Sequence, residues 1–149
     1  REILFFQIKE KALYYNIAAA SEKEIDEYNI LNATYLAMER AVEPIYSKSE
    51  IILVDGNKIP PKIQENCQGN INCVIKGDAK SASIAAASIL AKVSRDMYMK
   101  LIDEKYPQYF FAKHKGYGTK VHYEMLDKYG ICEIHRMSFL KKYIAQKSN

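Results

Sequence analysis

The sequence lacks any apolar run long enough to cross a lipid bilayer, since a spanning helix needs about 20 predominantly apolar residues. Its first fifteen residues contain charged side chains at helical spacing and do not resemble a signal peptide. Cysteine is scarce, with no C-x-x-C pair and no H-x-x-x-H pattern, so nothing indicates a zinc site. The three cysteines favour reduced thiols in a cytoplasmic protein, and a Cys67–Cys73 disulfide is the alternative.

Acidic residues are also absent after Glu133, although four basic residues follow it. Residues 1–50 hold six basic and nine acidic side chains, a net charge of −3. Residues 51–149 hold sixteen and nine, a net charge of +7. This polarity indicates an anionic partner for the second half, with nucleic acid as the first candidate. A solvated basic surface on an ordinary enzyme would show the same charge distribution.

The hydrophobic pattern predicts one α/β domain over residues 1–149, with a helical C-terminal part from about residue 119. Short buried strands are expected at 16–20, 50–55 and 73–75, with a loop from Pro60 to about Asn70. The S-x-x-E pattern at Ser21 is typical of a capping box. Helices are therefore expected at 1–15, from Ser21, and at 30–42, 80–105, 119–130 and 138–146.

Asp55 and Asp78 each follow a short apolar run that we interpret as a buried strand. Ligands of open α/β sheets bind in the crevice beyond the carboxyl ends of the strands. If the two strands are neighbours, a spacing of about 5 Å brings both carboxylates within reach of one divalent cation, which prefers oxygen ligands. The alternative is that both aspartates are turn residues making Asx-type hydrogen bonds.

The helix expected after Asp78 is rich in small residues and carries one polar stripe of Ser81, Ser88, Lys92 and Arg95. Its first turn, near Ser81, presents unpaired N–H groups that suit a phosphate. Lys92 lies roughly 17 Å further along the axis, so it suits a more distant phosphate on a duplex. Pairing of Lys92 with Asp96, four residues on, is the alternative.

The segment between Tyr106 and Tyr123 contains no acidic residue, and Lys113, His114 and Lys115 precede Gly116-Tyr117-Gly118. Flanking glycines permit unusual dihedral angles, so the ring of Tyr117 is placed to stack on a sugar or base while the lysines bind phosphates. A surface loop with a half-buried tyrosine is the alternative. His114 suits a general acid or base, but its spacing favours a solvated histidine.

Several segments resemble those of bacterial-type ribonuclease HII, the type 2 ribonuclease H family. They occur in that family's order and cover most of the chain: EIDEYNILNATYLAMERAV (24–42), IILVDGN (51–57), VIKGDAKSASIAAASILAKVSRD (74–96), YPQYFFAKHKGYGT (106–119) and IHRMSF (134–139).

The resemblance implies a ribonuclease H-like mixed sheet flanked by helices. It also implies Mg²⁺- or Mn²⁺-dependent cleavage of the RNA strand in RNA–DNA hybrids and at single ribonucleotides in duplex DNA. Asp55 and Asp78 match two of the family's four metal-binding carboxylates, and Tyr117 matches its junction-sensing tyrosine. Arg136 matches a position that usually carries arginine, whereas Met137 stands where a second arginine is common. Lys115, Lys92 and Ser81 are expected to help bind the nucleic acid, and a monomer is expected when the protein is intact.

The family's other two carboxylates lie in an N-terminal D-E-x-G-R-G motif, which these 149 residues do not contain. The only Asp-Glu pairs, at 26–27 and 103–104, lack the glycine and arginine that should follow. The family's initial strands are missing as well, as in a truncated chain or the ordered part of a longer protein. Two carboxylates are too few for a pair of cations about 4 Å apart, so we expect these residues alone to be inactive and prone to associate. A non-catalytic hybrid- or DNA-binding module is the alternative function.

Overall fold

The chain is mostly helical in a computed structural model that describes residues 1–67 and 70–147. Within those ranges no helix is both long and apolar enough to cross a membrane. The elements follow in the order α1 (Glu2–Lys11), α2 (Glu22–Val42), η1 (Glu43–Lys48), β1 (Ile51–Asp55), α3 (Pro61–Asn66), β2 (Asn70–Val74), η2 (Gly77–Ala79), α4 (Ala82–Lys105), η3 (Pro107–Tyr109), α5 (Phe111–His114), α6 (Lys120–Tyr129) and α7 (Met137–Lys147).

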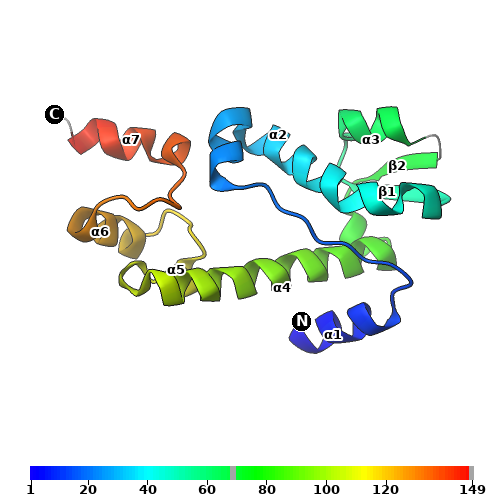
Figure 1. Ribbon diagram of the computed structural model, residues 1–149, viewed down its shortest axis with the longest axis horizontal. Coiled ribbons are helices and arrows are strands. Elements are labelled where there is room, and N and C mark those ends of the chain that lie inside the picture. Colours follow the sequence, from blue (N-terminus) through cyan, green and yellow to red (C-terminus); the bar gives the residue numbers. More distant parts are fainter. Residues whose placement is uncertain (68–69, 148–149) are drawn as a thin grey trace.

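Helix α4 is the longest element and runs along most of the molecule (Figure 1). The two strands, α3 and α1 lie toward one of its ends, whereas α5, α6 and α7 lie toward the other (Figure 1). Its alanine-rich first half suits close packing, because small side chains let neighbouring backbone approach. Helix α4 therefore fixes how far the strand ends lie from the C-terminal helices.

Two hydrophobic clusters form on α4, one near the middle of the helix and one further toward its C-terminal end. The first consists of Phe5 from α1 packed on Leu90 and Val93. The second joins Met99 to buried residues of the C-terminal elements, namely Tyr109, Phe111, Leu126 and Leu140. Each cluster is small, and each depends on α4 for one side of its packing.

Strands β1 and β2 form a two-stranded parallel sheet, with Asp55 opposite Val74. Strand β1 buries Ile52 and Val54 but exposes Ile51 and Leu53. The prediction of buried strands is therefore wrong for β1, and it is also wrong at 73–75, where β2 ends at Val74 and both Cys73 and Ile75 are exposed. Side chains alternate between the two faces of a strand, so within the described residues the face of β1 that carries Ile52 and Val54 is covered and the face that carries Ile51 and Leu53 is not.

Most predicted helices are present. The capping box at Ser21 is confirmed, since Ser21 Oγ accepts a hydrogen bond from Glu24 N and Glu24 accepts one from Ser21 N. The helix from Ser21 and the helix expected at 30–42 are both present as the two parts of α2, separated by a non-helical Asn29 with φ of 67°, whose Oδ1 accepts hydrogen bonds from Leu31 N and Asn32 N. The helices predicted at 80–105, 119–130 and 138–146 correspond to α4, α6 and α7. The first helix ends at Lys11, four residues earlier than predicted.

Two predictions for segments that connect these helices are wrong. Residues 16–20 do not form a strand; instead the Asn16 side chain donates hydrogen bonds to Arg40 O and Ala41 O at the end of α2. The last carbonyl groups of a helix have no partner within the helix, and Asn16 supplies one to two of those of α2. Residues 16–20 are therefore held against the end of α2 and do not pair in a sheet. The loop predicted at 60–70 contains helix α3, which begins at Pro61, a favourable first helical position. Residues 68–69 of that loop lie outside the described part of the chain.

The predicted α/β class is confirmed only in part, since the described residues show parallel strands and helices but no mixed sheet. The three cysteines are free, so a Cys67–Cys73 disulfide is not formed. Assignment of residues 1–149 to one domain with a C-terminal extension stays a prediction.

Helix α7 is tied to α2 by one carboxylate. Asp26 accepts hydrogen bonds from Met137 N at 2.7 Å, from Ser138 N at 3.0 Å and from Ser138 Oγ. Burial alone would raise the pKa of Asp26, but the hydrogen bonds from Ser138 and Met137 outweigh it and the pKa is lowered. Asp26 thus caps α7 from a distant part of the sequence and fixes the position of Arg136, which directly precedes that helix.

Substitution of Asp26 by alanine should destabilise the fold by about 1–3 kcal/mol, because it leaves the first N–H groups of α7 without an acceptor. Urea unfolding of the protein measures this loss. Asp26→Asn retains one carbonyl oxygen and should cost less. An alanine variant with an unchanged unfolding midpoint would contradict the assignment of Asp26 as the cap.

Candidate active site

Asp55 ends β1, and its Oδ1 accepts a hydrogen bond from Gly77 N at 2.8 Å. Gly77 directly precedes Asp78 in η2, so the structure brings the Asp55 carboxylate to the turn that carries Asp78. Both aspartates are exposed to solvent. The hydrogen bond to Gly77 N also matches the turn-forming role that was the alternative for Asp55.

Asp78 does not stand at the end of a strand, contrary to the prediction. Strand β2 ends at Val74, and Lys76 adopts a left-handed conformation with φ of 56°. The chain turns at this residue into η2, where the Gly77 N–H donates a hydrogen bond to Asp55. Asp78 therefore lies on a short 3₁₀ helix between β2 and α4.

Close packing requires glycine at position 77. A Cβ atom there would lie 2.5 Å from Ile84 Cδ1 and 3.1 Å from Asp55 Oδ1, and Ile84 is buried. The Gly77 carbonyl accepts a hydrogen bond from Ser81 N at 2.8 Å. One glycine thus links β1, the turn and the start of α4.

Ser81 is the N-cap of α4, and its Oγ accepts a hydrogen bond from Ile84 N at 3.4 Å. The hydroxyl therefore serves the helix in this structure. The remaining N–H groups of the first turn are those that the sequence analysis assigned to a phosphate, and that assignment stays a prediction.

The polar stripe of α4 reaches the tyrosine loop through Arg95. Arg95 Nη2 donates a hydrogen bond to Lys115 O at 3.5 Å, and Lys115 Nζ lies 3.7 Å from Asp96 Oδ1. Asp96 therefore pairs with Lys115 rather than with Lys92, so the alternative suggested for Lys92 is wrong. The Lys92 side chain is exposed.

The loop around Tyr117 has an unusual backbone. Lys115 and Gly116 adopt left-handed conformations with φ of 54° and 81°. The Tyr117 side chain is 73% exposed, which excludes the alternative of a half-buried ring. Its carbonyl, by contrast, accepts hydrogen bonds from Thr119 N at 2.8 Å and from His122 Nδ1 at 3.0 Å. The ring is therefore presented to solvent by an anchored backbone.

Arg136 lies half-buried beside this loop, with its guanidinium carbon 3.8 Å from the centre of the Phe139 ring. Burial lowers the pKa of Arg136, and the positive charge of nearby Arg95 lowers it further. Arg95 was placed in the polar stripe but not among the candidate binding residues. Its proximity to Arg136 arises from tertiary packing that sequence spacing does not show.

All three histidines form a buried cluster that no pattern in the sequence predicts. His114, predicted to be solvated, is buried, as are His122 and His135. The His114 and His122 rings stack at 4.4 Å between centroids, and His122 Nε2 lies 3.0 Å from His135 Nε2. No sequence motif links positions 114, 122 and 135, because they come from three different segments.

A metal centre is not complete in the described residues, which contain no group of three or more His, Cys, Asp or Glu arranged to bind an ion. Asp55 and Asp78 nevertheless supply hard oxygen ligands of the kind that Mg²⁺ and Mn²⁺ prefer. Asp55 uses Oδ1 for the bond to Gly77, which leaves Oδ2 for a cation. The two residues fit a divalent cation as part of a larger ligand set.

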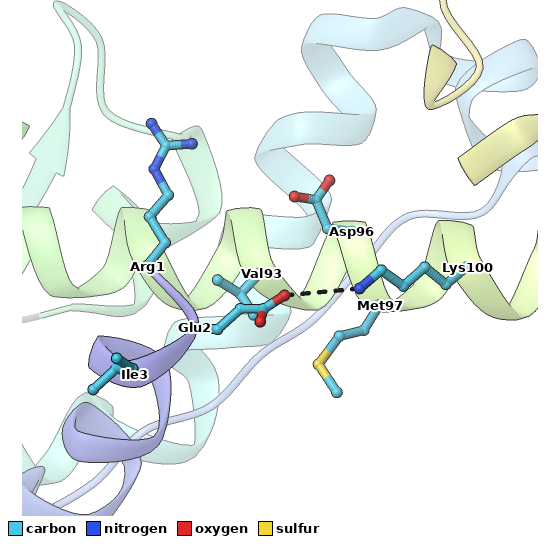
Figure 2. Close-up of a pocket in the computed structure, with 7 residues that line it drawn as sticks. All are labelled: Arg1, Glu2, Ile3, Val93, Asp96, Met97 and Lys100. Carbon is cyan, nitrogen blue, oxygen red and sulfur yellow. Dashed lines mark ion pairs between the residues drawn. The ribbon is translucent and has the colours of Figure 1, made fainter. Parts of the chain in front are cut away.

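A shallow pocket lies elsewhere, between α1 and α4 (Figure 2). The ion pair of Glu2 and Lys100, at 3.7 Å, joins two of its lining residues, and Asp96 also lines it (Figure 2). None of the predicted site residues lines this pocket.

Comparison with known proteins places the chain in a class of nucleases. The family model described as Ribonuclease HII matches residues 1–142. The chain therefore belongs to the ribonuclease HII family.

Similar proteins named Ribonuclease HII occur in several bacteria. The chain is 55% identical to that of Caldicellulosiruptor bescii over 97% of its own length and 68% of the relative. It is 52% identical to that of Acinetobacter baylyi, over 93% of the chain and 71% of the relative. It is also 52% identical to that of Clostridioides difficile, over 97% of the chain, but it spans only 54% of that relative.

The histidine cluster predicts a loss of stability in mild acid. Burial, together with the nearby His122, lowers the pKa of His135 from 6.5 to about 4. The unfolded chain therefore binds more protons than the folded chain between these values, so stability falls as the pH falls. We expect a loss of about 2 kcal/mol between pH 7 and pH 5 from His135, measured by urea unfolding at each pH.

The matched control is His135→Asn, which does not titrate and keeps an acceptor near the position of Nδ1. Its stability should fall less steeply over the same range, with the remaining slope due mainly to His122, whose pKa burial also lowers. Equal slopes for the two proteins would refute the assignment of the acid sensitivity to His135.

Proposed function

We propose that the protein containing this chain is an endonuclease that cleaves the RNA strand of RNA–DNA hybrids, including single ribonucleotides embedded in duplex DNA. Family membership over residues 1–142 is the observation that carries this proposal. The position of Asp55 against Gly77, next to Asp78, supports it, because it brings two carboxylates of the expected ligand set to one turn.

Asp55 and Asp78 are the proposed catalytic and metal-binding residues, with Mg²⁺ or Mn²⁺ as the cofactor. The chemistry that two such cations supply when bound is activation of a water molecule and stabilisation of the departing 3′ oxygen. The chain's own residues have a positioning role: Gly77 N holds Asp55 through Oδ1, so that Oδ2 would be the oxygen that holds a cation. No protein nucleophile is required by this proposal.

Substrate binding is assigned to the cationic surface around the tyrosine loop. Tyr117 presents an exposed ring for stacking at the ribonucleotide, and Lys115 and Arg136 lie beside it to hold the phosphate backbone. Lys92 and Ser81 are assigned to more distant phosphates along α4. Affinity for the duplex should fall with rising salt, because phosphate contacts release counterions.

A second candidate function is a module that binds hybrids or DNA without cleaving them. The observation that favours it concerns the cationic side chains of Lys115, Arg95 and Arg136. They are held together by contacts that do not involve Asp55 or Asp78. Hybrid binding without cleavage by the natural full-length protein would favour this function over the enzyme.

We propose further that the protein is a single domain, that it is monomeric when intact, and that it is located in the cytoplasm.

Asp55→Asn and Asp78→Asn, each in the full natural protein, should lower the rate of cleavage of a ribonucleotide-containing duplex by at least about 100-fold in Mg²⁺, because each removes a charged metal ligand. Binding of the same duplex should change little. Asp127→Asn, on α6, removes an equal charge and serves as the matched control. Full activity of either active-site variant would exclude that residue from the metal site.

The 149 residues tested alone should show no turnover with Mg²⁺ or Mn²⁺, because they carry two of the family's four carboxylates. They should also associate in solution, since Ile51, Leu53 and Ile75 expose apolar surface on or next to the sheet. A cleavage assay and analytical ultracentrifugation measure the two properties. Robust turnover by these residues would show that Asp55 and Asp78 suffice.

A further inference from the structure

The three buried histidines come from three segments that meet next to the tyrosine loop. His114 ends α5, His122 lies in the first turn of α6, and His135 precedes α7. Their rings stack in sequence, with centroids 4.4 Å apart for His114 and His122 and 5.2 Å apart for His122 and His135. The ring of Phe111 contacts all three. Their imidazole nitrogens are therefore shielded from water and need partners within the protein.

The partners at the two ends of this cluster fix where the protons lie. The carbonyl of Tyr117 can only accept, so His122 Nδ1, at 3.0 Å, must carry a hydrogen. A neutral His122 then has an unprotonated Nε2, which accepts from His135 Nε2–H at 3.0 Å. A neutral His135 in turn has an unprotonated Nδ1, which accepts from Cys132 N at 3.0 Å.

A single direction of donation thus runs from Cys132 N–H through His135 and His122 to the Tyr117 carbonyl. His114 has a separate arrangement, in which Gly116 N donates to its Nδ1 at 3.2 Å and its Nε2 donates to Tyr109 O at 2.7 Å. The groups that face His122 are His114, His135 and the cationic Arg136. Like-charged neighbours and burial disfavour protonation, which keeps His122 neutral.

The tyrosine loop depends on the histidines for its anchoring. Gly116 N donates to His114 Nδ1 at 3.2 Å, and Tyr117 O accepts from His122 Nδ1 at 3.0 Å. The flanking residues Gly116 and Gly118 have no side chains that could restrain the loop, and the Tyr117 ring is exposed. The backbone on both sides of this ring is therefore held by histidines.

We propose that His122 is a positioning residue, which holds the Tyr117 loop through the hydrogen bond from its Nδ1–H to Tyr117 O, and that His135 supports it by donating to His122 Nε2 and so fixing the tautomer that makes this bond. The importance of this loop for substrate rests on the proposed function, whereas the chain of hydrogen bonds does not. His122 acts through the backbone of Tyr117 and touches no substrate itself.

Two variants of His122 separate the two hydrogen bonds. His122→Asn places an amide N–H near the position of Nδ1 and keeps the bond to the Tyr117 carbonyl. His122→Gln places an amide oxygen near the position of Nε2, so it keeps the bond from His135 but loses the bond to Tyr117. The variants have similar chemistry, so a difference between them reports the bond to Tyr117.

Nuclear magnetic resonance of the protein without substrate provides the first test. The ¹⁵N shifts of the imidazoles should show the Nδ1–H tautomer for His122 and the Nε2–H tautomer for His135. Hydrogen exchange at Thr119 N, which shares the Tyr117 carbonyl, should be about three- to tenfold faster in His122→Gln than in His122→Asn. Exchange at Gly130 N, at the end of α6, serves as the control amide.

The Nε2–H tautomer at His122 in the unsubstituted protein would overturn the proposal, whether or not the variants fold. Equal exchange at Thr119 in the two variants would also overturn it, because the bond to Tyr117 would then carry no restraint.

A kinetic measurement tests the link to function separately. In the full natural protein, His122→Gln should raise KM for a duplex with one embedded ribonucleotide about three- to tenfold, with a smaller change in kcat, and His122→Asn should not. If exchange at Thr119 responds as expected but KM does not, the role of Tyr117 in substrate binding fails and the hydrogen-bond chain stands.

Discussion

The close contact at Gly77 is the constraint on which the candidate site depends. Asp55 reaches the Gly77 N–H at 2.8 Å, and buried Ile84 leaves no room for a side chain on the glycine. The Gly77 carbonyl in turn accepts a hydrogen bond from the backbone N–H of Ser81, which is the N-cap residue of α4. The end of β1, the turn with Asp78 and the direction of the longest helix are therefore set together, and a shift at one of them displaces the other two.

Local signals in the sequence were sufficient where a structure depends on neighbouring residues. The capping pattern at Ser21 and the polar stripe from Ser81 to Arg95 both fall on helices that were correctly predicted. Residues 16–20 were wrongly predicted as a strand, because Asn16 bonds to the end of α2 and that contact is not local. Strand burial was overestimated for a similar reason: a short apolar run does not reveal whether one face or both are covered.

The candidate site shows the same division. The proximity of Asp55 to the turn that carries Asp78 was predictable, because two apolar runs each end near an aspartate. The left-handed conformation of Lys76, which places Asp78 beyond the strand, was not predictable from the sequence. The buried histidines were missed because their environment is assembled from α5, α6 and the segment before α7. Burial of a polar residue by distant segments is a property of the fold, and the spacing of 114, 122 and 135 carries no periodicity that indicates it.

The capping of α7 by Asp26 has a consequence for how the chain acquires its structure during synthesis. The two partners are separated by 111 positions, so the Asp26 carboxylate has no helix to cap until residues 137 and 138 have been synthesised. The packing of α1 on α4, in contrast, involves only residues that are synthesised earlier. The contribution of Arg136 to the cationic surface beside Tyr117 accordingly forms only after residues of α1 and α4 have been synthesised.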